Sequence, residues 1–172
     1  DLTSPLPADD LVLRAARAHQ AHAAAGLGAH IGVAKRIPAQ AGMGGGSSDA
    51  ATCLLALNRL WKLNLPLSTL EKLGLSLGAD VPFFLRGHNA WVEGIGESIT
   101  PIELPAAEVV VVKPEAGLDT KSIFSAADLE RATKPAILSG FAAYAAQETE
   151  RMFGFGRNDL QPVAQRLCPA VT

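Results

Sequence analysis

The sequence is poor in the residue types that mark several large classes of protein. Its 172 residues include two cysteines, two tryptophans and one tyrosine, and aromatic residues make up 5 %. Cys53 and Cys168 lie far apart and outside any CxxC pattern, which excludes a disulfide framework and favours a reducing, cytoplasmic setting. We expect Cys53 to be a small buried residue on a helix.

An excess of one charge and long apolar runs are also missing. Fifteen basic side chains stand against 17 acidic ones, and the resulting net charge of -2 gives no electrostatic basis for binding nucleic acid or an anionic membrane. The valine run at 109–112 has the length of a strand and is far too short to span a bilayer. Hydrophobic residues still make up 48 %, so the chain is globular and long enough to bury a core.

Apolar residues at helical spacing predict several helices. Asp9 or Asp10 supplies a cap for the first of them, and Ala50, Leu54 and Leu57 share one face of the strongest. We expect helices over residues 8–26 and 48–63, over a short stretch opened by a capping box of Ser68 and Glu71, and again from Ser122 onward.

Alternating and continuous apolar segments predict strands between these helices. Residues 30–38 alternate and end at Pro38, residues 89–103 read as two short strands joined by a turn, and residues 107–114 read as a buried strand. No repeat or low-complexity linker divides the sequence. The mixture of strands and helices predicts an α+β or α/β chain.

The densest cluster of glycine stands directly before the strongest predicted helix, in "PAQAGMGGGSSDAAT" from Pro38 to Thr52. Glycine permits close approach of the backbone to a ligand, and a helix N-terminus adds unpaired N–H groups and a favourable dipole. Ser47 and Ser48 add hydroxyl groups suited to phosphate oxygens or magnesium. The segment therefore predicts a phosphate-binding loop, and the alternative is a plain flexible turn.

Two common phosphate-binding motifs are excluded by the order of residues in this loop. A P-loop requires lysine and then serine or threonine after its last glycine, whereas Gly46 is followed by Ser47 and the loop contains no lysine. A dinucleotide-binding fingerprint requires G-x-G-x-x-G, whereas Ser47 stands at the third position after Gly44.

The loop resembles the Pro-x-x-x-Gly-x-Gly-Ser-Ser loop of the GHMP kinases. The blocks "LLALNRLWKLNL", "LGADVPFFLRGHNAWVEGIGE", "VVVVKPEAGLDT" and "RNDLQPVA" resemble the branch of that family that acts on 4-diphosphocytidyl-2-C-methyl-D-erythritol. The resemblance implies an α+β fold with two halves, both incomplete here. Residues 1–105 would form an N-terminal half like the second domain of ribosomal protein S5, and residues 106–172 a ferredoxin-like C-terminal half.

The same resemblance implies transfer of the γ-phosphoryl group of ATP, with Mg2+, to the 2-hydroxyl of that substrate. Asp80 matches the family's general base, and the alternative is that it only caps a helix. Lys35 matches a position near the nucleotide, and the alternative is a solvated lysine at a strand end. The residues implied to bind the nucleotide are Lys35, Pro38, Ala39, Gln40, Ala41, Gly42, Met43, Gly44, Gly45, Gly46, Ser47 and Ser48.

Other polar residues receive structural interpretations. Asp49 would repel phosphate if it faced the loop, so we expect it to face outward. His19 and His22 are three residues apart on a helix, and we expect a surface or half-buried pair rather than a metal site. Packing or capping roles are expected for Asn58, Trp61, Trp91, Asn158 and Asp159.

Members of the family have longer chains, so we expect this sequence to be a fragment that lacks both ends. The family's N-terminal lysine motif and C-terminal glycine motif find no counterpart here, which predicts weak or no activity for the 172 residues alone. We expect a small-molecule substrate, no nucleic acid or membrane partner, and a monomer or homodimer. Two alternatives stay open: a GHMP kinase for another alcohol, and a nucleotide-binding module without catalysis.

Overall fold

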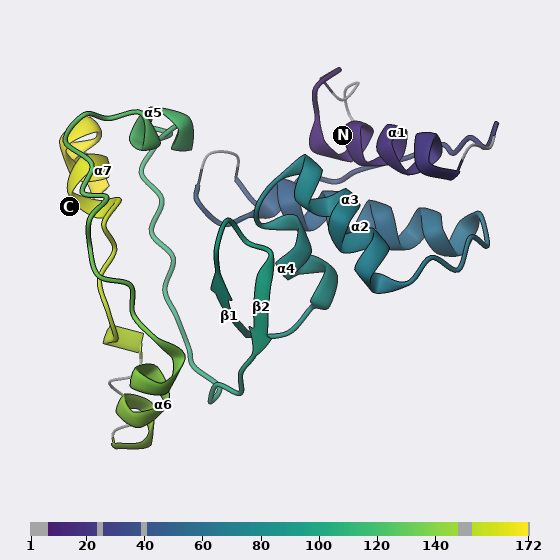
Figure 1. Cartoon of the computed structure of the whole chain (residues 1–172). Helices are drawn as coiled ribbons and strands as arrows, with labels where there is room; N and C mark the ends of the chain where they lie inside the picture. The colour runs from purple at the N-terminus through teal and green to yellow at the C-terminus, as the bar shows by residue number, and fades with distance from the viewer. Residues whose placement is uncertain (1–6, 24–25, 39–40, 148–152, 172) are drawn as a thin grey trace. The chain divides into compact units, whose positions relative to one another are not determined.

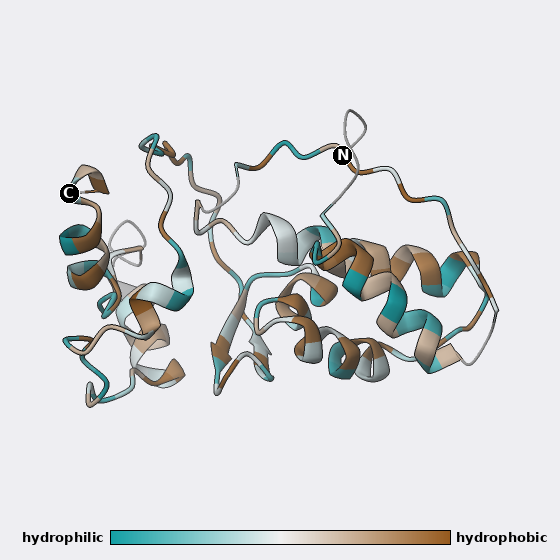
Figure 2. Ribbon diagram, turned by 90° about the horizontal axis from the view of Figure 1, so that it is seen from above, coloured by the Kyte–Doolittle hydropathy of each residue, from teal (hydrophilic) through white to brown (hydrophobic). Residues whose placement is uncertain are grey.

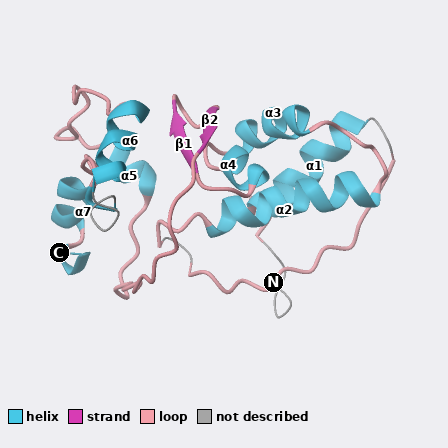
Figure 3. Ribbon diagram, turned by 90° about the horizontal axis from the view of Figure 1, so that it is seen from below, coloured by secondary structure: helices cyan, strands magenta, loops and turns pink. Residues whose placement is uncertain are grey.

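The computed structural model describes residues 7–23, 26–38, 41–147 and 153–171 (Figure 1). The chain divides into two compact units, the first built from Met43–Leu104 with the described residues up to 38, and the second from residues 41–42 and those from Pro105 onward. Helices dominate both, and in the described ranges the strands form one two-stranded sheet, drawn in magenta in Figure 3. The chain is therefore α+β with little β-structure.

Four helices build most of the first unit. Helix α1 lies along α2, and α4 contacts both α2 and α3 (Figure 1). Hydrophobic and hydrophilic residues alternate around these helices, as amphipathic helices on a shared core require (Figure 2). The helices are α1 (Leu11–Ala23), α2 (Gly45–Leu60), α3 (Leu67–Leu77) and α4 (Val81–Arg86).

The core of this unit confirms the helical spacing read from the sequence. Leu54 is completely buried, and Leu57 and Ala50 lie beside it on the same face of α2. Cys53 is also buried, as expected, and burial raises the pKa of its thiol to about 11. The remaining buried hydrophobic residues of this core are Val12, Ala15, Ala51, Leu70, Val81 and Leu85.

His19 differs from its expected position. It is fully buried, not at the surface or half-buried, and its ring lies 5.6 Å from the ring of Trp61 between centroids. Trp61 in turn donates a hydrogen bond from Nε1 to the Gly28 carbonyl at 3.3 Å. Tertiary packing therefore assigns His19 to the core of the first unit, which no local pattern indicated.

The predicted helix caps have different outcomes. Asp10 caps α1, because its Oδ1 accepts a hydrogen bond from the Val12 amide at 2.8 Å. The capping box of Ser68 and Glu71 is wrong, since α3 begins directly after Pro66 and no side chain caps it. The fixed φ of proline starts the helix earlier and places Glu71 in its second turn, where it pairs with Arg86 of α4 at 2.7 Å.

The predicted pair of short strands is confirmed as a hairpin. Strand β1 (Ala90–Glu93) pairs antiparallel with β2 (Ser98–Pro101), and Trp91 lies opposite Thr100. The turn between them contains Gly94 and Gly96, both with positive φ, at +70° and +113°. This backbone conformation explains why the turn contains two glycines.

The other two predicted strands are wrong. Residues 30–38 form no strand in the described part of the chain, although Ile31 and Val33 pack against the helical core as their alternation suggests. Residues 107–114 also form no strand, and the four valines at 109–112 are 61–92 % exposed. A strand requires a hydrogen-bonded neighbour, and β1 and β2 pair only with each other within the described ranges.

The described residues of the second unit include short helices and a small core, to which the first and the last of its α-helices contribute. Helix α5 (Thr120–Phe124) is capped by Asp119, whose Oδ2 accepts from the Ser122 amide at 3.0 Å. The helical pattern predicted from Ser122 onward is confirmed by this helix and by α6 (Leu138–Gln147), α7 (Gln161–Leu167) and the short 3-10 helix η2 (Pro169–Val171). The buried residues of its core cluster are Ile123, Leu129 and Val163.

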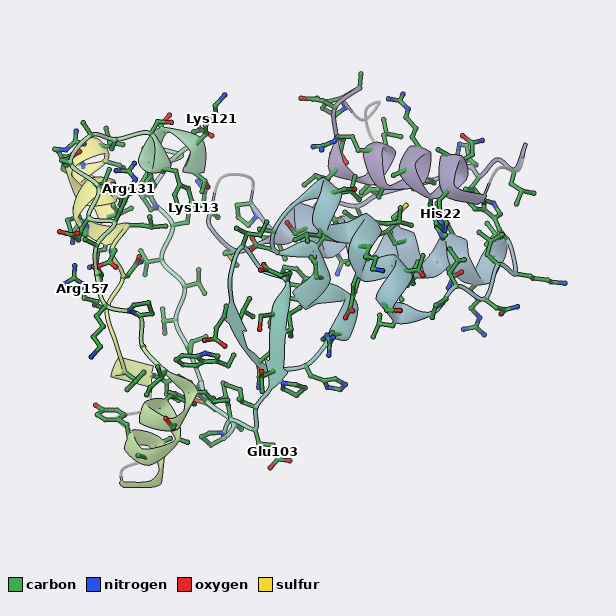
Figure 4. All side chains as sticks on the ribbon, viewed as in Figure 1. His22, Glu103, Lys113, Lys121, Arg131 and Arg157 are labelled. Carbon is green, nitrogen blue, oxygen red and sulfur yellow. The ribbon has the colours of Figure 1, made fainter. Side chains whose placement is uncertain are left out.

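Polar contacts supplement this small core. Arg131, labelled in Figure 4, donates hydrogen bonds to the carbonyl oxygens of Phe124 and Leu129 at 2.6 and 3.1 Å. Asn158 accepts from the Leu160 amide at 3.0 Å in the turn ahead of α7, but no side chain caps that helix, so Asn158 is not the expected helix cap. Among the described residues, no helix is long and apolar enough to cross a membrane.

Candidate functional site

The glycine-rich segment leads directly into α2. The helix begins at Gly45, three residues earlier than predicted, so its first turn contains Gly45, Gly46 and Ser47. Gly44 stands at the N-cap with φ +66°, its carbonyl accepts from the Ser48 amide at 2.9 Å, and no side chain caps the helix. First-turn amides have no partner within an α-helix, so this end offers N–H donors and a positive dipole end to an anion.

The glycines of this segment serve two different purposes. A Cβ on Gly44 would lie 2.7 Å from the Phe84 ring, and a Cβ on Gly45 would lie 2.9 Å from Ile37. These two glycines therefore allow the backbone to pack closely against the protein itself. A Cβ on Gly42 would meet no atom within 4 Å, and there the positive φ of +67° favours glycine.

Lys35 lies beside the start of α2 and pairs with two carboxylates. Its Nζ is 2.8 Å from Asp49 Oδ2 and 3.3 Å from Asp10 Oδ2. Burial favours the neutral amine, but the hydrogen bonds to Asp49 and Asp10 outweigh it and raise the pKa of Lys35 above its ordinary value. The protonated lysine thus links the N-terminal ends of α1 and α2, and it is not the isolated solvated lysine of the alternative interpretation.

Asp80 lies in a tight turn immediately before α4. The Gly78 carbonyl accepts from the Val81 amide at 3.1 Å, which closes the turn around Ala79 and Asp80. Asp80 occupies the N-cap position of α4 and is exposed, yet its side chain makes no capping hydrogen bond. The interpretation of Asp80 as a helix cap is therefore wrong.

Helix α4 connects this turn to the glycine loop. The Phe84 amide donates to the Asp80 carbonyl at 3.3 Å, and the Phe84 ring lies against the backbone of Gly44. Phe84 therefore links the two parts of the candidate site: its ring contacts the N-cap of α2, and its amide contacts Asp80. Sequence reasoning did not assign this packing role to Phe84, because the contact joins segments that are distant in the chain.

The remaining predicted site residues have less defined surroundings. Pro38 and Met43 are exposed, and Ala41, Ser47 and Ser48 are half-buried. Ala39 and Gln40 lie outside the described residues. Asp49, expected to face outward, is directed at Lys35 with 34 % of its side chain exposed. In the described part of the chain, no group of three or more His, Cys, Asp or Glu side chains suits a metal ion.

Asn58 has a structural role, as expected. Its Oδ1 accepts from the Leu65 amide at 3.0 Å, and its Nδ2 donates to the Leu65 carbonyl at 3.1 Å. One side-chain amide thus satisfies both backbone groups of a residue in the connection between α2 and α3. Asn58 therefore holds the end of α2 against the following segment.

Comparison with known families identifies the class of protein. Residues 10–88 match the sequence model described as "GHMP kinases N terminal domain". This range begins at the cap of α1, contains the glycine loop, and ends just after α4. Both parts of the candidate site, the loop and Asp80, lie inside it. Residues 10–88 therefore resemble the N-terminal domain of GHMP kinases.

Individual relatives are more specific. The chain is 70 % identical to the "4-diphosphocytidyl-2-C-methyl-D-erythritol kinase" of Variovorax paradoxus (strain S110), over all of this chain and 61 % of that protein. It is 67 % identical to the protein of the same name from Polaromonas sp. (strain JS666 / ATCC BAA-500), over 97 % of this chain and 53 % of that one. The chain thus spans between half and two thirds of the length of these relatives.

A solved structure agrees with these sequence relatives. The crystal structure of 4-(cytidine 5'-diphospho)-2C-methyl-D-erythritol kinase matches with a TM-score of 0.71 at 32 % identity. The match covers 97 % of this chain and 60 % of the solved chain. The fold of the chain is therefore that of part of a GHMP kinase.

Proposed function

We propose that the protein containing this chain transfers the γ-phosphoryl group of ATP to the 2-hydroxyl of 4-diphosphocytidyl-2-C-methyl-D-erythritol. The observation that carries the proposal is the uncapped start of α2, whose Gly44 packs against the helix that follows Asp80. Phosphoryl transfer to an alcohol requires donors that hold the phosphates and a group that orients the hydroxyl. The helix end offers such donors, and the nearby carboxylate offers such a group. The names of the relatives supply the substrate class.

The ATP phosphates would lie at residues 38–48. The first-turn amides from Gly45 to Ser47 donate hydrogen bonds to phosphate oxygens, and the hydroxyls of Ser47 and Ser48 add further donors. Lys35 would also lie near the phosphates, and its charge is compensated by the carboxylates of Asp10 and Asp49. Mg2+ would accompany ATP and neutralise charge on its phosphates when bound, and the hydroxyls of Ser47 and Ser48 are of a type that suits it.

Asp80 would act as the general base. Its exposed carboxylate accepts the proton of the 2-hydroxyl while that oxygen attacks the γ-phosphorus, and the positioned hydroxyl is thereby made a better nucleophile. The absence of a capping hydrogen bond leaves this carboxylate available for the task. Phe83 and Phe84, half-buried and packed edge to face at 5.3 Å, limit water on one side of it.

Domain organisation and setting complete the proposal. Residues 1–105 would belong to the N-terminal domain of the kinase and residues 106–172 to its C-terminal domain. We infer a cytoplasmic monomer or homodimer whose partners are small molecules. A GHMP kinase for a different alcohol would share the same phosphate loop, so the experiment below compares alcohol substrates.

The first test is ADP release by the complete product of the gene that encodes this sequence. It receives Mg2+ and ATP together with 4-diphosphocytidyl-2-C-methyl-D-erythritol, mevalonate, homoserine or galactose. We expect turnover with the cytidyl substrate alone. Turnover with another alcohol would overturn the substrate assignment and leave the phosphate loop standing, and ATP binding without any turnover would favour a nucleotide-binding module.

Asp80→Asn tests the general base in the same assay. Loss of the base is expected to lower kcat by about 10²–10⁴-fold. The affinity for ATP should stay unchanged, because the phosphate loop is untouched, and equilibrium binding of an ATP analogue measures this. Asp9→Asn, an exposed aspartate ahead of α1, is the matched control. Near-normal turnover of Asp80→Asn would exclude the proposed role.

A further inference from the structure

The hairpin turn between β1 and β2 touches the segment that carries Asp80. A Cβ on Gly96 would lie 2.1 Å from the carbonyl oxygen of Ala79, 2.9 Å from its carbonyl carbon and 3.3 Å from its Cα. Real Cβ atoms do not lie this close to backbone atoms, so only glycine fits at this position. Gly96 is also buried, although the turn residues on both sides of it are exposed.

The direction of the Ala79 carbonyl follows from these distances. Its oxygen is the atom nearest to Gly96, so the carbonyl group points at the hairpin turn. In a trans peptide the following N–H points the opposite way, and the described residues contain no cis peptide bond. The contact with Gly96 thereby fixes the orientation of the peptide plane that leads into Asp80.

The other side of Asp80 is anchored by a second close approach. Val81 is completely buried, and a Cβ on Gly74 would lie 2.9 Å from its Cγ1. The exposed Asp80 therefore stands between two anchored residues: the Ala79 carbonyl packs against the hairpin, and the Val81 side chain packs against α3. The position of an exposed side chain is well defined only where its backbone is supported in this way.

We propose that Gly96 is a positioning residue for Asp80, which it serves by fixing the Ala79–Asp80 peptide. This inference rests on the proposed role of Asp80 as general base. Gly96 contacts neither nucleotide nor substrate in this scheme, and it acts only through the peptide before the base. This role explains why the hairpin turn approaches the peptide before Asp80 so closely that no methyl group fits between them.

Gly96→Ala is the principal test, with Gly87→Ala as the matched control. Gly87 ends α4 with φ +66°, and a Cβ there meets nothing within 4 Å, so the control adds backbone strain near the site without a clash. In the complete gene product we expect Gly96→Ala to lower kcat by about 100-fold, the order of loss for a displacement of about 1 Å. The KM for ATP should not change, and Gly87→Ala should keep the wild-type kcat.

A merely structural role would give a different result. It predicts that both variants lose thermal stability while neither changes kcat in the folded protein, and equal kcat values for the two variants overturn the proposal. If Gly96→Ala does not fold, Glu97→Ala decides. Glu97 is exposed and its Oε2 accepts from the Ile95 amide at 2.7 Å, so its loss loosens the turn without a clash. A fall in kcat supports the proposal, and an unchanged kcat overturns it.

A measurement without turnover separates this inference from the proposed function. Backbone amide chemical shifts of Ala79, Asp80 and Val81 in the 172-residue chain should move in Gly96→Ala and stay in place in Gly87→Ala. If the wild-type gene product phosphorylates none of the alcohols, the proposed function fails, and these shifts alone decide whether Gly96 holds the peptide. Unmoved shifts in Gly96→Ala would overturn the inference even where the enzyme assay succeeds.

Discussion

The two units of the chain differ sharply in how they are stabilised. Among the described residues, the first has a core cluster of ten buried residues drawn from its four helices, whereas the cluster of the second has three. Helices are the main regular structure among the described residues of both units, so helical propensity does not explain the difference. In the first unit the apolar stripes face one another, and in the second the run of valines at 109–112 covers nothing and is covered by nothing in the described structure.

This difference shows where a catalytic geometry finds support. The start of α2, the Asp80 turn and the hairpin that touches it all belong to the well-packed unit. An exposed carboxylate and a set of backbone amides act reliably only when the elements behind them are rigid. The second unit also has polar pairs, such as Arg166 with Asp128 at 2.8 Å, but an exposed ion pair adds little stability.

The largest stability effect should separate the two cores. Leu54→Ala removes a completely buried side chain from the first core and should cost about 2–5 kcal/mol in the free energy of unfolding. Val163→Ala in the second core should cost about 1–2 kcal/mol, because it removes fewer carbon atoms from a smaller cluster. Urea unfolding reports both changes, with tryptophan fluorescence for the first unit, which contains Trp61 and Trp91, and residue-resolved NMR for the second.

Leu55→Ala is the control for that comparison. Leu55 follows Leu54 on the same helix but is 42 % exposed, so its truncation should cost much less. Equal losses for the two leucine variants would contradict the assignment of the buried face of α2. If Val163→Ala lowered the free energy of unfolding as much as Leu54→Ala does, the two cores would not differ in the way described.

Sequence reasoning predicted the helices well because a helix satisfies its hydrogen bonds within one segment. The spacing of Ala50, Leu54 and Leu57 places them on one face of a helix, and these residues form the buried side of α2. The strands predicted at 30–38 and 107–114 failed because a strand depends on a partner that its own pattern does not specify. The hairpin at 90–101 succeeded because its partner follows within one turn.

The candidate site divides in the same way. The glycine loop was proposed from local chemistry and family resemblance and Asp80 mainly from that resemblance, and the functional roles of both stay predictions. The packing of Gly44 against Phe84 and of Gly96 against Ala79 was not, because each joins residues far apart in sequence. The "EGIGE" segment indicated a turn, but no local signal indicates what a turn will touch.

A pH-dependent effect of intermediate size should also reside in the first unit. Burial, together with the nearby charge of His22, lowers the pKa of His19 below its ordinary value of 6.5. The unfolded chain therefore binds the proton more tightly than the folded chain does. Stability should be undiminished above pH 6.5 and should fall as the pH drops below 6.5 toward the lowered pKa. Urea unfolding between pH 7.5 and 5.5 measures this loss.

His19→Leu isolates the contribution of that residue. The variant cannot take up the proton, so its loss of stability over the same pH range should be smaller than that of the wild type. His30→Gln, at an exposed histidine of the same unit, should leave the wild-type pH dependence unchanged. A His19→Leu profile parallel to the wild-type profile would show that other groups cause the acid sensitivity.

The smallest effect is expected in the second unit, where the structure and the sequence pattern disagree most. Val110 is 92 % exposed, so Val110→Lys should change the free energy of unfolding by less than about 0.5 kcal/mol. Val33→Lys, at a half-buried position packed on the core of the first unit, should be clearly destabilising. Thermal unfolding of both variants makes the comparison. If Val110→Lys instead costs several kcal/mol, the desolvation of a buried charge is the cause, and the valine run is the buried strand that its composition predicts.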